Sequence, residues 1–143
     1  MGRRILVPID GSSKAREGLE YALSTYPDEE IMVLHVMTPY ETEDANDQPL
    51  PQELAEQWHD QAREQATDIL DDAHTLANEY GVEISTALEV GEAWRTIVDY
   101  TEENDIHHVI MGSHGRADDS PLPLGSVAET VMRQSPVLVS IVR

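Results

Sequence analysis

The chain opens with the stretch Arg3-Arg4-Ile5-Leu6-Val7-Pro8-Ile9-Asp10-Gly11-Ser12-Ser13. Its apolar run is short, which is typical of a strand buried on both faces of a parallel sheet. The polar residues that end the stretch favour a tight turn and supply N-cap candidates for a helix. Apolar residues then recur at helical spacing as far as Pro27, namely Ala15, Leu19, Ala22, Leu23 and Tyr26. The opening of the chain therefore predicts a strand, a turn and a helix.

The same alternation of strand and helix continues to the C-terminus. Further strands are predicted over residues 31–36, 82–90, 108–111 and 137–142. A long helix with an apolar stripe from Leu54 to Tyr80 ends at Gly81, and shorter helices are predicted over 93–100 and 126–133. The pattern predicts an α/β fold: a single open, mostly parallel five-stranded sheet with helices on both faces.

The length and composition favour one cytoplasmic domain. The chain has 143 residues, the size of a single domain, so residues 1–143 are expected to form one unit. It contains no cysteine, which excludes disulfides and thiolate metal sites. The first apolar run is too short for a signal peptide, and no run approaches the roughly 20 apolar residues that a membrane helix needs.

The charge is strongly negative and excludes several partners. There are 28 acidic residues against 9 basic ones, a net charge of −19, and Lys14 is the only lysine. Such a surface disfavours nucleic acid and anionic membrane, because both are bound through cationic contacts. The carboxylates are spread along the whole chain, so their mutual repulsion would be screened only at high salt. This favours a halophilic source.

Ligands of open parallel sheets bind beyond the carboxyl ends of the strands, so the turns there are candidate sites. The turn 10–13 matches neither the glycine-rich loop of dinucleotide-binding folds nor the lysine-containing P-loop. Two interpretations of it remain open. Asp10 and Ser12 either cap the following helix, which these residue types favour when taken alone, or contribute to a ligand site.

The turn after the fourth predicted strand gives a stronger signal. Gly112 and Gly115 permit positive φ angles and a close approach of backbone to a ligand. Successive N–H groups in such a turn form a concave anion site. Ten residues further on, Gly125-Ser126 opens a helix, whose free N–H groups and dipole favour a phosphate. The pattern Gly-x2-Gly-x9-Gly-Ser therefore predicts a phosphate-binding loop.

These segments together resemble the universal stress protein (UspA-like) family, in its ATP-binding branch. The resemblance covers essentially the whole chain and rests on 5–12, His35-Val36, 91–93, 105–115 and 136–139. It implies a Rossmann-like fold of the adenine nucleotide α-hydrolase type, and an adenine nucleotide, ATP, as ligand.

The resemblance also implies roles for single residues. Gly112, Gly115, Gly125 and Ser126 would hold the phosphates. Asp10 would reach the ribose or a phosphate-bound metal ion, and Pro8 would shape the pocket floor. Val36 would touch the adenine, and Met111 and Val127 would line the site. His114 and Arg116 are the nearby candidates for charge balance, whereas Asp118 and Asp119 add negative charge to the loop. ATP is therefore expected to enter with Mg²⁺.

These residues are compatible with three functions. The first is an ATP-binding stress-response protein that acts as a dimeric, nucleotide-dependent switch. The second is a dimeric interaction scaffold that binds no nucleotide, and the third is a slow ATPase. Phosphoryl transfer needs positioned cations and a group that aligns the nucleophile, and this loop offers no lysine and no evident base apart from Asp10. A binding module is therefore favoured over an enzyme.

The remaining distinctive side chains are predicted to have packing or surface roles. The six histidines show no metal-binding spacing, and Trp58 and Trp94 lack the basic patch that accompanies base-stacking platforms in nucleic-acid-binding proteins. The apolar strand 137–142 is expected at a sheet edge, where it would pair with a second copy of the chain. The resemblance likewise implies a homodimer through this strand.

Overall fold

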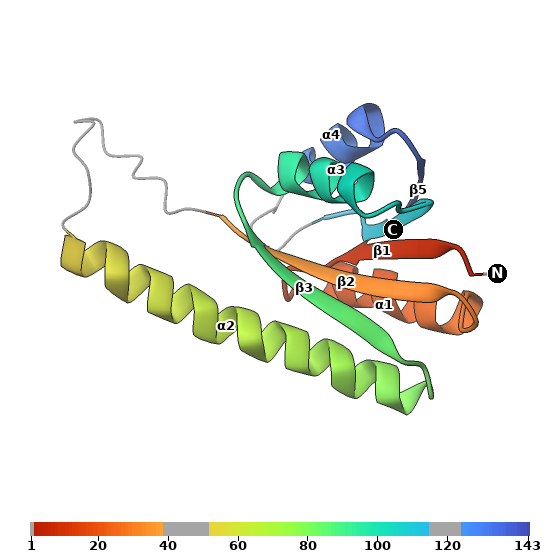
Figure 1. Ribbon diagram of the computed structural model, residues 1–143, viewed down its shortest axis with the longest axis horizontal. Coiled ribbons are helices and arrows are strands. Elements are labelled where there is room, and N and C mark those ends of the chain that lie inside the picture. Colours follow the sequence, from red (N-terminus) through yellow and green to blue (C-terminus); the bar gives the residue numbers. More distant parts are fainter. Residues whose placement is uncertain (1, 39–51, 115–123) are drawn as a thin grey trace.

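The computed structural model describes residues 2–38, 52–114 and 124–143, with the backbone alone for 52–55. Its core is one sheet in the order β3-β2-β1-β4-β5, in which all neighbouring strands run parallel (Figure 1). The strands are β1 (Arg4–Pro8), β2 (Glu30–Met37), β3 (Ile84–Val90), β4 (His108–Gly112) and β5 (Leu138–Val142). This confirms the predicted open parallel sheet.

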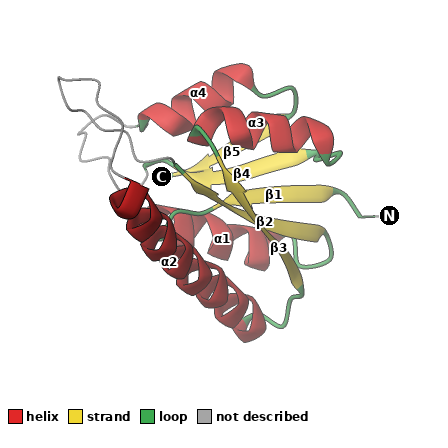
Figure 2. Ribbon diagram, turned by 60° about the vertical axis from the view of Figure 1, so that its left-hand side comes forward, coloured by secondary structure: helices red, strands yellow, loops and turns green. Residues whose placement is uncertain are grey.

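The helices cover both faces of the sheet (Figure 2). They are α1 (Ser13–Thr25), α2 (Gln52–Glu79), α3 (Ala93–Glu103) and α4 (Ser126–Gln134). The chain first builds outward from β1 to β3, then crosses back and builds outward from β4 to β5. Because right-handed crossovers made in opposite directions place their helices on opposite faces, α1 and α2 cover one face, and α3 and α4 cover the other.

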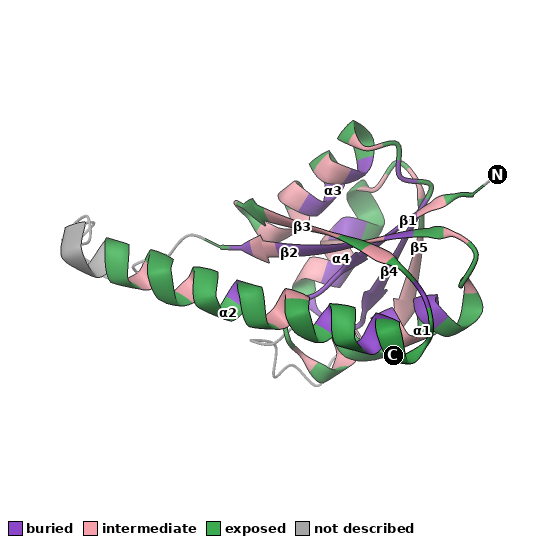
Figure 3. Cartoon of the chain, turned by 60° about the horizontal axis from the view of Figure 1, so that its bottom comes forward, coloured by how far each residue is buried: buried purple, intermediate pink, exposed green. Residues whose placement is uncertain are grey.

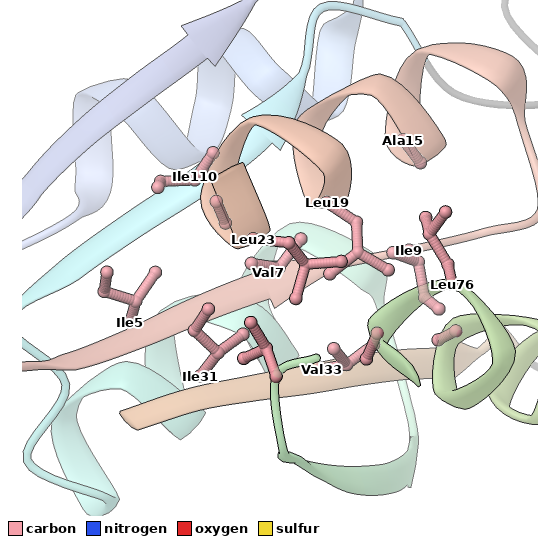
Figure 4. Close-up of a cluster of buried hydrophobic side chains, with 14 residues drawn as sticks. Ile5, Val7, Ile9, Ala15, Leu19, Leu23, Ile31, Val33, Leu76 and Ile110 are labelled. Carbon is pink, nitrogen blue, oxygen red and sulfur yellow. The ribbon is translucent and has the colours of Figure 1, made fainter. Parts of the chain in front are cut away.

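Two apolar clusters, one on each face, hold these layers together. On one face, Ile5 and Val7 of β1 pack with Leu19 and Leu23 of α1 and Leu76 of α2 (Figure 4). On the other face, Leu6 of β1 packs with residues of α3 and α4. The central strands are buried on both sides, whereas α2 exposes most of its surface (Figure 3). This matches the continuous apolar runs of β1 and β4.

The C-terminal end of α2 shows why the third strand begins later than predicted. Gly81 has φ +68°, and its N–H donates to Asn78, while the Val82 N–H donates to Ala77. These are the two hydrogen bonds of a Schellman motif. Val82 belongs to the helix stop, so the strand starts at Ile84 rather than Val82.

His108 of β4 is a buried titratable group next to the edge strand. It is 5% exposed, and its Nε2 lies 2.7 Å from the Ser140 hydroxyl of β5. Burial lowers the pKa of His108 below its ordinary value, and the charge of Arg3 lowers this pKa further. The folded chain therefore favours the neutral ring.

This arrangement predicts a loss of stability in mild acid. The unfolded chain takes up a proton on His108 at the ordinary pKa of about 6.5. The contribution of His108 is complete above that pKa and is lost as the pH falls through the lower pKa of the folded state. Denaturant unfolding between pH 7.5 and 5.5 should show the wild type losing stability relative to a His108→Gln variant. A constant difference between the two proteins would contradict the prediction.

Candidate nucleotide site

A cavity of about 680 Å³ lies beyond the carboxyl ends of β1, β2 and β4. The strand order reverses between β1 and β4, the place where open α/β sheets bind ligands. Nine of the residues predicted from the sequence line this cavity: Pro8, Asp10, Val36, Met111, Gly112, His114, Gly125, Ser126 and Val127. Gly115 and Arg116, together with Asp118 and Asp119, lie outside the described residues.

The turn after β1 caps α1 and also faces the cavity. The Ser12 hydroxyl is the N-cap of α1 and accepts from the Ala15 N–H at 3.2 Å. The Asp10 carboxylate accepts from the Ser12 N–H at 2.9 Å, which fixes the turn. The capping interpretation is thus confirmed for Ser12, and Asp10 supports the same turn. Because Asp10 also lines the cavity, the two interpretations of this residue are compatible.

The turn after β4 lies directly against the turn after β1. The Ser12 hydroxyl donates to the His114 carbonyl over 3.5 Å, and the Ser113 hydroxyl lies 3.0 Å from Nδ1 of His114. The Ser113 N–H donates to Val142 of β5 at 2.9 Å. Hydrogen bonds between three strand ends therefore define one corner beside the cavity.

The structural reason for a glycine at position 112 differs from the predicted one. Its φ is not positive, unlike that of Gly11. A Cβ atom built on Gly112 would lie 2.5 Å from the backbone carbon and oxygen of Lys14. The glycine is therefore required because the start of α1 approaches β4 closely, and not because the backbone needs a left-handed conformation.

The N-terminus of α4 lies next to the turn after β4. Gly125 is its N-cap, with φ −76°, so this glycine also does not use a positive φ. The Gly125 N–H donates to the Ser113 carbonyl at 2.6 Å and so joins the two ends of the predicted loop. The N–H of Gly125 is thus engaged within the loop, and the predicted role of Gly125 toward a phosphate stays a prediction.

The first turn of α4 supplies the available donors instead. The N–H groups at the first positions of an α-helix have no acceptor within the helix. Here these belong to Ser126, Val127 and Ala128, all of which line the cavity. The exposed Ser126 side chain adds a hydroxyl. Among the described lining residues, this turn suits an anion, since amide donors and the helix dipole act together there.

The charged residues that line the described part of the cavity are both acidic. They are Asp10 and Glu129, and the Glu129 carboxylate accepts from Arg133 at 2.8 Å. No lysine or arginine is among the described lining residues. In the described parts of the chain, no three histidine or carboxylate side chains gather as metal ligands.

The end of β2 forms an apolar wall of the cavity. Val36, Met37 and Thr38 line it. Val36 and Val127 both pack against the apolar cluster between the sheet and helices α3 and α4. The buried His35 also lines the cavity, and its Nδ1 lies 2.8 Å from the Ile9 carbonyl. Since a carbonyl only accepts, Nδ1 of His35 is the donor of this hydrogen bond. This contact ties β2 to the turn after β1.

Sequence reasoning missed the wall that α2 contributes. Trp58, Ala62, Gln65 and Ile69 of this helix line the cavity. Trp58 was predicted to be a packing residue, and the structure shows that it also reaches a cavity wall. The helical spacing of these residues was visible in the sequence, but that spacing does not tell what the stripe covers.

The sequence matches the model of a known protein family over its whole length. A family model described as the universal stress protein family matches residues 1–143. The chain belongs to this family. A curated relative, universal stress protein MJ0577 of Methanocaldococcus jannaschii, is 28% identical, with 97% of this chain and 94% of the relative covered.

Solved structures of universal stress proteins have the same fold. UspA from Lactobacillus plantarum superposes with a TM-score of 0.86 at 21% identity, covering 99% of this chain and 97% of that one. A universal stress protein from Archaeoglobus fulgidus, solved in complex with dAMP, superposes with a TM-score of 0.70 at 19% identity, covering 100% and 98%. In the described parts of this universal stress protein, no helix is both long and apolar enough to cross a membrane.

Proposed function

We propose that this universal stress protein binds ATP as a magnesium complex and acts as a nucleotide-dependent switch in the cytoplasm. The observation that carries the proposal is that a phosphate-binding element and an apolar wall line the same cavity. The first turn of α4, at Ser126, offers N–H groups and a hydroxyl to phosphates. The end of β2, at Val36, offers an apolar wall to a base. The dAMP bound by the Archaeoglobus fulgidus protein supports an adenine nucleotide as ligand.

We include a magnesium ion because of the charges that line the cavity. Asp10 and Glu129 would repel a free triphosphate, and no described lysine or arginine lines the cavity to balance it. Magnesium commonly binds one or two carboxylates together with substrate phosphates and water. Asp10, placed at the end of β1, is the carboxylate we assign to this ion. Gly115 and Arg116 remain proposed contacts of the phosphates.

The test is direct binding at molar KCl, where the charge of −19 is screened. Protein purified in this salt is denatured, and the released nucleotides are identified by chromatography. The nucleotide-free protein is then titrated with ATP in the presence and absence of Mg²⁺. We expect an adenine nucleotide in the first assay and tighter ATP binding with Mg²⁺ in the second. A protein that releases none and binds none would instead be the interaction scaffold.

We also propose that two copies of the chain pair through β5. This strand lies at the edge of the described sheet and bonds to β4 on its other side. Its first residue, Leu138, is 62% exposed, and Met132 at the end of α4 is 45% exposed. An apolar edge strand of this kind invites pairing with another chain.

The dimer predicts a specific effect of charge at this edge. A Leu138→Glu variant would place two like charges within the interface and should run as a monomer. Val90→Glu is the matched control, because Val90 is 57% exposed and lies on β3, the opposite edge of the sheet. Sedimentation velocity in molar KCl distinguishes the species. A monomeric wild type, or an unaltered dimer in the Leu138→Glu variant, would exclude this interface.

A further inference from the structure

Helix α2 is much longer than the strands that it covers. It has 28 residues, a length of about 42 Å, whereas β2 has 8 residues and spans about 26 Å. Figures 1 and 3 show the N-terminal half of α2 extending beyond the sheet. The overhang lies at the carboxyl ends of the strands, since α2 follows β2 in the chain.

One apolar stripe runs along both parts of this helix. In the C-terminal part, Ala66 and Ala73 are 0% and 3% exposed. Ala73 belongs to the apolar cluster that α2 forms with the sheet and α1. The same stripe continues N-terminally through Ala62 to Trp58 at steps of four residues, which keeps these side chains on the same face. In this N-terminal part, Trp58 and Ala62 line the cavity. Ile69, which packs against the sheet core, lines the cavity as well.

We propose that the indole of Trp58 is the surface on which the base of the bound nucleotide stacks. This inference rests on the proposed function and specifies how the base is selected. Trp58 is half-buried and supplies a flat aromatic face, and no other tryptophan, tyrosine or phenylalanine is among the described lining residues. The amides of α4 contribute binding energy through the phosphates, whereas an aromatic face contributes binding energy only through the base.

Trp58 therefore acts as a specificity residue for ligands that carry an aromatic base. The second tryptophan of the chain serves as an internal control. Trp94 of α3 packs against the cluster below α3 and α4, and the Arg95 guanidinium lies 5.2 Å from its ring centre. Trp94 is not among the described residues that line the cavity.

Two ligands separate stacking from phosphate binding. ATP and inorganic tripolyphosphate, each with Mg²⁺, are titrated into the full chain in molar KCl and measured by equilibrium dialysis. A Trp58→Ala variant should bind ATP about 10-fold more weakly or worse, as alanine substitutions of base-stacking residues do. Its affinity for tripolyphosphate should change less than twofold. Trp58→Phe should retain most of the ATP affinity, and Trp94→Ala should retain all of it.

Fluorescence gives an independent readout. In a Trp94→Phe variant all tryptophan emission comes from Trp58, so ATP should change this emission and tripolyphosphate should not. Unchanged ATP affinity in Trp58→Ala, or an equal loss of both ligands, would overturn the stacking role and leave the proposed function standing. Failure of the wild type to bind ATP at all would overturn both.

Discussion

Replacing Ser126 with glutamate should abolish ATP binding while the protein stays folded. The new carboxylate would stand in the first turn of α4, among the amides proposed to hold the phosphates. Like charges forced together cost several kcal/mol, so the affinity should fall by about 100-fold or more. The same carboxylate interacts favourably with the helix dipole, by about 0.3–1 kcal/mol, so the stability should be unchanged or higher. Isothermal calorimetry and denaturant unfolding measure the two effects.

Two further variants serve as controls for this result. Ser126→Ala removes one hydroxyl donor and should weaken the binding of ATP by about 3- to 10-fold. Ser24→Glu adds the same charge to an exposed site near the C-terminal end of α1, at the amino ends of the strands, and should leave the affinity unchanged. ATP binding by Ser126→Glu at wild-type affinity would show that the phosphates do not lie at α4.

Replacing Gly112 with alanine should destabilise the fold strongly. The added methyl group would lie 2.5 Å from two backbone atoms of Lys14 and 2.8 Å from the Ala15 nitrogen. Backbone cannot rotate away as a flexible side chain can, so α1 and β4 must separate. We expect a loss of about 2–4 kcal/mol in the free energy of unfolding, in the upper range of overpacking substitutions.

The control for this prediction is another glycine with room for a side chain. The atoms nearest to a Cβ on Gly2 would lie 3.7 Å away, so Gly2→Ala should change stability by less than about 0.5 kcal/mol. Both variants are unfolded with urea at the same KCl concentration. A Gly112→Ala protein within 1 kcal/mol of the wild type would mean that α1 does not approach β4 as closely as described.

Local sequence patterns were sufficient to predict the helices and strands and the edge of the sheet at which most of the candidate residues lie. The Ser12 cap, the Gly81 helix stop and the start of α4 at Ser126 each depend on a few adjacent residues, and the structure has all three. The helical period of α2 and the apolar runs of the strands are likewise local properties. Because ligand sites of open parallel sheets lie at the carboxyl ends, these elements were enough to gather the predicted residues at one edge.

What only the tertiary structure decided are the contacts between distant segments. Gly112 is required because of Lys14, some hundred residues away, and the Gly125 N–H is engaged because the loop closes on Ser113. Trp58 faces the cavity because α2 is longer than the sheet beneath it. Residue spacing determines which side chains share a face, since this is geometry within one element. What that face meets depends on how separate elements pack, and no local pattern contains this information.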